Sequence, residues 1–175
     1  MCGVVTLDPG TFMSIEDSRF PKGGVVVIGS LSGATQERLA QATDGNVRQV
    51  PGAPLTHIVE KPGTDLRKLS QRINGVVGSE GIVAPIFTDA EGNSLLPTGS
   101  LQVRFKQAVT DSSLDEFATR HNVKLAQRNK WSPQQAEFTV RTDDTRYFPD
   151  IATELKTDKE VAAAWPDVQA TFRRV

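Results

Sequence analysis

Residues that support metal binding or disulfide formation are scarce in this chain. Its 175 residues include one cysteine and two histidines. A single cysteine excludes an internal disulfide and a cysteine-based zinc site. Neither His57 nor His121 has a second ligand at a metal-binding spacing, such as a histidine four residues along a helix. The sequence therefore predicts neither a metal site nor a cofactor.

Excess charge and long hydrophobic runs are also missing. The formal net charge is −1 and the pI is near 6.1, which gives no electrostatic reason to expect nucleic acid or an anionic membrane as a partner. No apolar run approaches the roughly 20 residues that cross a bilayer. The N-terminus lacks the basic and apolar regions of a secretory signal. We therefore expect a cytoplasmic protein that binds neither nucleic acid nor membrane.

Three short motifs point to chemistry, and each has a plainer interpretation. Met1-Cys-Gly-Val-Val5 is similar to the start of class II glutamine amidotransferases, whose nucleophile is an N-terminal cysteine. The glutamine-binding segments of those enzymes are not found downstream, so Cys2 is interpreted as an ordinary thiol. Gly29–Gly33 lies between a predicted strand and a predicted helix, as anion-binding turns do, but has no Walker or dinucleotide pattern. His121 follows a predicted helix, whose dipole favours a cation there, and this is the plainer interpretation of that histidine. We therefore expect no catalysis by this chain.

Hydrophobic residues make up 38% of the chain, enough for the core of one large domain or two small ones. Residues 1–22 are irregular and are expected to form an N-terminal arm. Residues 23–90 predict a strand, a helix, two strands, a helix and a strand. These elements are Val25–Ile28, Thr35–Thr43, Asn46–Val50, Leu55–Glu60, a helix capped by Thr64, and Gly81–Phe87.

The same order returns in residues 100–175, after a predicted linker at residues 91–99. Leu101, Val103 and Phe105 alternate with polar residues, which indicates a strand with one buried face. The other predicted elements are a helix from Ser112 or Ser113, the strands Val123–Gln127 and Ala136–Arg141, a helix capped by Asp150, and the strand Val161–Val168.

This order predicts an α+β fold made of two ferredoxin-like split βαβ (βαββαβ) modules. Each module would form a four-stranded antiparallel sheet with two helices on one face. The two halves are alike in the order of their elements and scarcely in residue identity.

Two segments of the second module are distinctive, Thr98-Gly-Ser-Leu-Gln-Val-Arg-Phe-Lys106 and Val161-Ala-Ala-Ala-Trp-Pro-Asp167. They resemble the propeptides of subtilisin-family serine proteases (subtilases), of the fervidolysin-like type. The segments that carry the subtilase Asp, His and Ser are absent, and Ala108 stands where the family often has glycine. The matching positions are Val103, Phe105, Trp165, Pro166 and Asp167.

The resemblance implies a non-catalytic protease inhibitor, a folding chaperone, or both. The sheet would dock on a subtilase and the C-terminal tail would lie in the substrate cleft like an added strand. It would act in trans if the chain is a whole gene product, and in cis if it is cut from a precursor. A frayed C-terminus is the plainer interpretation of this tail, which consists of Phe172, Arg173, Arg174 and Val175.

A second hypothesis needs no protease. Two ferredoxin-like modules in tandem would serve as a ligand-sensing module or as a scaffold for assembly. Deletion of residues 171–175 separates the hypotheses, because it would abolish protease inhibition and leave a ligand sensor intact.

Overall fold

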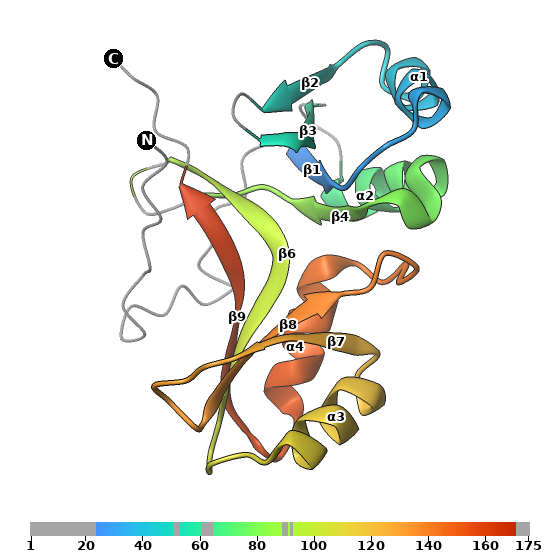
Figure 1. Cartoon of the computed structure of the whole chain (residues 1–175). Helices are drawn as coiled ribbons and strands as arrows, with labels where there is room; N and C mark the ends of the chain where they lie inside the picture. Colours follow the sequence, from blue (N-terminus) through green and yellow to red (C-terminus); the bar gives the residue numbers. More distant parts are fainter. Residues whose placement is uncertain (1–23, 51–52, 61–64, 89–90, 92, 171–175) are drawn as a thin grey trace.

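The computed structural model describes residues 24–50, 53–60, 65–88, 91 and 93–170. In these residues the chain is a mixed α+β protein with four α-helices and two antiparallel β-sheets (Figure 1). The predicted α+β class and the antiparallel pairing are thereby confirmed. We call residues 24–85 unit 1 and residues 87–170 unit 2.

Unit 1 contains one antiparallel sheet and two helices. Its elements are β1 (Gly24–Ile28), α1 (Gly33–Ala42), β2 (Val47–Val50), β3 (Ala53–Glu60), α2 (Leu66–Val77), the 3-10 turn η1 (Gly78–Glu80) and β4 (Ile82–Pro85). The strands lie in the order β2-β3-β1-β4. Val26 of β1 is opposite Ile58 of β3 on one side and Ala84 of β4 on the other. β1 is therefore an inner strand, as its continuous apolar sequence indicates.

Unit 2 repeats this arrangement with one extra short strand. Its elements are β5 (Phe87–Thr88), β6 (Ser94–Phe105), α3 (Asp111–Arg120), β7 (Val123–Arg128), β8 (Gln135–Val140), α4 (Phe148–Thr157) and β9 (Val161–Ala170). β6 pairs with β5, β8 and β9, and β7 extends the sheet beyond β8. β6 begins inside the segment predicted as a linker.

Side chains cap the start of three helices. Ser32 accepts a hydrogen bond from the N–H of Thr35 before α1, and Asp65 accepts from two N–H groups of α2. Thr110 and Ser113 form a capping box at α3. The prediction that Asp150 caps the last helix was wrong, because α4 begins at Phe148 and has Pro149 in its first turn. None of the helices in the described ranges is long and apolar enough to cross a bilayer.

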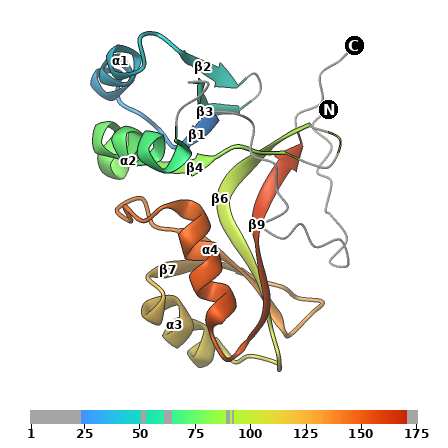
Figure 2. The ribbon, with the colours of Figure 1, turned by 180° about the vertical axis from the view of Figure 1, so that it is seen from behind.

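The sheet of unit 1 is buried on both faces. Val25 and Val27 pack with Leu39 and Ile73 of the two helices of unit 1. Val26, which points the other way, belongs to the large core cluster of unit 2. Figure 2 shows unit 2 on the far side of this sheet from α1, with β6 and α4 adjoining it. The two units therefore share a core and form one body.

A glycine lets β6 pass close to unit 1. Gly99 has a φ of +88°, and a Cβ there would lie 2.9 Å from Cδ1 of Ile82. The pairing of β6 with β9 also shifts between Pro97 and Leu101, as at a β-bulge. A side chain at this position would be strained by the backbone and would collide with β4.

Polar contacts also join the units on the helical side. Arg67 of α2 makes a bidentate hydrogen bond to the carboxylate of Asp150 in α4. Its guanidinium lies 4.6 Å from the ring centroid of Tyr147. Burial raises the pKa of Tyr147 to about 12, so this ring stays neutral beside the ion pair.

Candidate functional site

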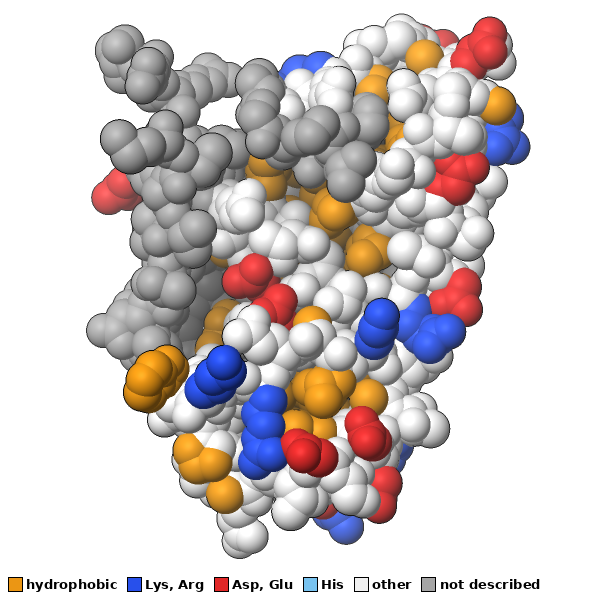
Figure 3. Space-filling model, viewed as in Figure 1, with side chains coloured by type: hydrophobic (Ala, Val, Ile, Leu, Met, Phe, Trp, Pro, Cys, Tyr) orange, Lys and Arg blue, Asp and Glu red, His pale blue; other side chains and the backbone are white. Residues whose placement is uncertain are grey.

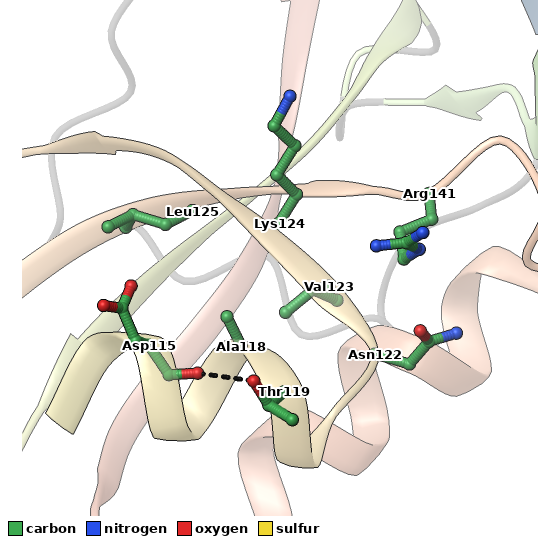
Figure 4. Close-up of a pocket in the computed structure, with 8 residues that line it drawn as sticks. All are labelled: Asp115, Ala118, Thr119, Asn122, Val123, Lys124, Leu125 and Arg141. Carbon is green, nitrogen blue, oxygen red and sulfur yellow. Dashed lines mark hydrogen bonds between the residues drawn. The ribbon is translucent and has the colours of Figure 1, made fainter. Parts of the chain in front are cut away.

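A groove opens between helix α3 and strand β7 of unit 2 (Figure 4). Its hollow measures about 490 Å³, and ligand pockets in proteins span about 300–1,000 Å³. The lining residues are Asp115, Ala118, Thr119, Asn122, Val123, Lys124, Leu125 and Arg141. We call this feature the α3–β7 groove.

One face of α3 forms the first wall of the groove. Ala118 and Thr119 come three and four residues after Asp115, so these three line up on one side of the helix. The hydroxyl of Thr119 donates to the backbone oxygen of Asp115 at 2.9 Å. Ala118 is small, which leaves space between the helix and the strand.

The strand β7 and the start of the loop after β8 form the second wall. Asn122 adopts a left-handed φ of 52°, and the chain turns there from α3 into β7. Val123 is 5% exposed and, with the half-buried Leu125, gives the groove an apolar floor. Lys124 and Arg141 lie across from α3 in Figure 4.

Residues of opposite charge therefore lie on the two sides of the groove, and the Lys124 side chain points away from α3 in Figure 4. The carboxylate of Asp115 is on the helical wall, and the cations of Lys124 and Arg141 are on the strand wall. Arg141 also donates to Asp143 at 3.1 Å. Among the described residues, the side chains of Asp115 and Lys124 have no ion-pair or hydrogen-bond partner. They are free to bind a charged group from outside.

A network of ion pairs supports the end of the groove. His121 caps α3 and is buried, with Nδ1 3.0 Å from Oε1 of Glu154 and Nε2 2.7 Å from Oδ2 of Asp158. Arg120 donates to the same oxygen of Asp158 at 2.8 Å. Burial acts to raise the pKa of Asp158, but donors from Glu160, His121 and Arg120 outweigh it and lower the pKa to about 2.

Arg146 extends this network to the groove. It donates to Asp144 at 2.6 Å, to Glu154 at 2.6 Å and to the backbone oxygen of His121 at 2.8 Å. Burial works against ionisation of Asp144, but the donors of Arg146 prevail and lower its pKa. These carboxylates are engaged in structural ion pairs, so they hold α3, α4 and the loop at residues 141–147 in place.

The predicted propeptide-like positions lie elsewhere in unit 2. Val103 and Phe105 of β6 are 0% and 3% exposed and belong to the core. Trp165, Pro166 and Asp167 are half-buried in β9; Trp165 lies opposite Gln102 of β6 and Pro166 opposite Leu101. None of the five lines the α3–β7 groove.

Asp167 has a structural partner. Its carboxylate accepts a hydrogen bond of 2.7 Å from the hydroxyl of Thr98. Burial raises its pKa, Thr98 partly offsets this, and the nearby charge of Glu137 adds to the rise. β9 continues past Asp167 to Ala170, opposite Leu95 of β6. The last strand, predicted to end at Val168, thus runs on to Ala170.

The predicted tail, the single cysteine and the first histidine lie away from the groove or outside the described residues. The tail Phe172, Arg173, Arg174 and Val175 lies outside the described residues, as does Cys2. His57 lies in β3, opposite Val27. In the ranges that the structure describes, no group of three or more His, Cys, Asp or Glu side chains is arranged to hold a metal ion.

The turn at Gly29–Gly33 binds an anion that the chain itself supplies. Glu80 of η1 accepts from the Ser32 N–H at 2.7 Å and from the Thr35 hydroxyl at 2.9 Å. These donors lower the pKa of Glu80. A Cβ on Gly29 would lie 2.3 Å from the backbone oxygen of Glu80, so only glycine fits this approach. An external phosphate would have to displace this carboxylate.

Comparisons with known proteins return little. No protein-family model matches the chain, and no curated protein matches it. Among solved structures, the small subunit of acetolactate synthase from Thermotoga maritima is similar at 12% sequence identity. The match covers 86% of this chain and 98% of that one, with a TM-score of 0.29.

These findings correct the predicted identity. The chain was expected to resemble a subtilase propeptide, but no comparison returns a subtilase or a propeptide, and the structure that is returned is a different protein. The prediction of a protease inhibitor or protease-folding chaperone was therefore wrong. The residues that carried it explain the error, because alternating apolar positions such as Val103 and Phe105 occur in any strand with one buried face.

Proposed function

We propose that this chain is a non-catalytic ligand-sensing module, in which two ferredoxin-like units form one rigid body and the α3–β7 groove binds a small polar ligand. This is the hypothesis that needed no protease. The observation that carries it is the groove itself, a hollow with an apolar floor and free charges of both signs on its walls.

The strand orders support the ferredoxin-like assignment. In unit 1 the order is β2-β3-β1-β4, and in unit 2 the corresponding strands β7, β8, β6 and β9 are neighbours in the same order. In unit 1, α1 connects β1 to β2 and α2 lies between β3 and β4; in unit 2, α3 connects β6 to β7 and α4 connects β8 to β9.

A binding role fits these side chains better than a catalytic one. Asp144, Glu154 and Asp158 near the groove are all engaged by arginine or histidine. A general base needs a carboxylate or imidazole that can take a proton from a substrate, whereas these groups are held in ion pairs. Asp115, Lys124 and Arg141 are suited to hold a charged ligand by direct contact. A cytoplasmic location and the lack of nucleic-acid or membrane partners stay predictions.

A ligand screen with a blocked groove tests this proposal. Small carboxylates, amines and zwitterions are added to the protein, and binding is followed by thermal shift and by NMR of the backbone amides. Thr119→Trp places a large ring in the groove from an exposed position. Thr153→Trp is the matched control, because Thr153 is also an exposed helical threonine whose hydroxyl donates to the carbonyl four residues before it.

A true ligand shifts amides of residues 115–125 and stabilises the wild type and Thr153→Trp, but not Thr119→Trp. A ligand that stabilises all three proteins equally binds elsewhere and contradicts the assignment of this groove.

A further inference from the structure

The rim of the α3–β7 groove has a charge pattern that is complementary to itself. The helical wall presents Asp115, and the strand wall presents Lys124 and Arg141. Asp115 and Lys124 are both exposed and, within the described part of the chain, have no other partner for their side chains. The two walls therefore carry charges of opposite sign.

Between these walls lies an apolar surface. Ala118, Val123 and Leu125 line the groove. Figure 3 shows hydrophobic side chains exposed between α3 and β7, with acidic and basic side chains around them. An apolar centre with a charged rim is the usual anatomy of a protein–protein contact.

We propose that a second copy of this chain docks on the α3–β7 groove, with a two-fold axis that runs along the groove. Rotation about such an axis exchanges the two walls. Asp115 of each copy then faces Lys124 and Arg141 of the other, and the two apolar floors meet. A two-fold axis across the groove would instead bring like charges together, so the charge pattern selects one orientation.

The strand β7 argues for side-chain docking and against the addition of an extended peptide. β7 is the outermost strand of its sheet beyond β8, but its pairing shifts between Leu125 and Gln127. A β-bulge and an exposed lysine on an edge strand both hinder backbone pairing with another strand. The net charge of −1 also puts little overall repulsion between two copies.

This proposal goes beyond ligand sensing and does not depend on it. Its test is the oligomeric state, measured by sedimentation equilibrium and light scattering over a range of protein concentrations. Two charge reversals, Asp115→Lys and Lys124→Glu, each place like charges across the contact. Each should weaken self-association by about tenfold or more.

Charge exchange makes the test specific. The double variant Asp115→Lys/Lys124→Glu restores opposite charges at positions 115 and 124 while Arg141 stays unchanged, so it should associate more tightly than either single variant. A mixture of the two single variants should form heterodimers in preference to either homodimer, because the unlike copies pair opposite charges at positions 115 and 124. Glu37→Lys and Lys159→Glu reverse exposed charges away from the groove and serve as controls; a mixture of these two should not associate more tightly than the wild type.

A chain that stays monomeric at several hundred micromolar overturns the proposal, and so does association that ignores both reversals. Ligand binding is measured separately, on dilute monomer with Thr119→Trp as the blocked form. Failure of the dimer therefore leaves the sensing function standing, and failure of the ligand screen leaves the dimer standing.

Discussion

Apart from the short strand β5, units 1 and 2 have the same order of strands and α-helices, but they bury their sheets differently. In β1 of unit 1, Val25, Val26 and Val27 are successive and all are 0% exposed. In β6 of unit 2, Leu101 and Val103 are fully buried, while Gln102 between them is partly exposed. The sheet of unit 1 is thus an inner layer between the helices of unit 1 and unit 2. Unit 2 keeps a polar sheet face, and it carries the groove and the charged network.

The largest expected effect tests the alternation in unit 2. Phe138 is fully buried and lies 5.1 Å from Phe117, centroid to centroid. Phe138→Ala should lower the free energy of unfolding by about 3–5 kcal/mol, because it removes apolar contacts and leaves a cavity. Thr139→Ala, at the next position on the other face, should cost less than about 1 kcal/mol. Urea denaturation measures both, and equal losses would contradict the one-sided burial of this sheet.

The next prediction concerns the two-sided burial of unit 1. Val25→Ala and Val26→Ala remove the same atoms from opposite faces of β1. Each should cost about 2–3 kcal/mol, since each removes buried methyl groups. If only Val25→Ala destabilises in urea denaturation, the contact between the units is loose in solution, and the shared core is disproved.

A smaller effect follows from the charged network of unit 2. The carboxyl of Asp158 has a pKa of about 2 in the folded protein, below the value of about 3.9 for an unfolded chain. Its contribution is therefore complete above about pH 4 and is lost as the pH falls toward 2. Asp158→Asn should cost about 1–3 kcal/mol at neutral pH, and the gap to the wild type should narrow in acid.

Chemical denaturation at a series of pH values between neutral and strongly acid measures this gap. Asp143→Asn is the control, because Asp143 pairs with Arg141 at an exposed site. A gap that stays constant down to the lowest pH would show that the ionised carboxylate of Asp158 does not stabilise the fold.

The smallest effect is expected at the polar contact between the units. Arg67 and Asp150 are each about half exposed, at 51% and 49%, and exposed ion pairs add little stability. Arg67→Ala should therefore destabilise less than either valine variant. A double-mutant cycle with Asp150→Asn measures the coupling energy of the pair. If Arg67→Ala lowers the free energy of unfolding as much as Val26→Ala does, this ion pair holds the units together as strongly as the shared core does.

Local patterns predicted most of the secondary structure. Apolar runs and alternation located most strands, and helical spacing located the four helices, but the separate strand β5 and the start of β6 inside the predicted linker were missed. Asp150 was misassigned as a helix cap because aspartate is favoured both at the N-cap and in the first helical turn, and it lies in the first turn of α4. The resemblance to a propeptide failed because its signal was not specific to that family. It relied on strand residues such as Val103, whose burial is common to many sheets.

The candidate site could not be predicted in the same way. Asp115, Lys124 and Arg141 are ordinary surface residues in the sequence, and the spacing of Asp115, Ala118 and Thr119 shows only that they share a helical face. The carboxylates that surround His121 come from α4 and the turn after it. Such groups are brought together by the packing of α3 and α4 on one sheet, which no short sequence pattern records.

The sequence by itself determined the kinds and order of the elements, because hydrophobic periodicity and capping act over a few residues. Only the tertiary structure decided that the two units share a core, that Glu80 occupies the turn at Gly29–Gly33, and that Asp115 and Arg141 line one groove. Those features depend on residues far apart in the chain, and their energies arise only when sheets and helices pack together.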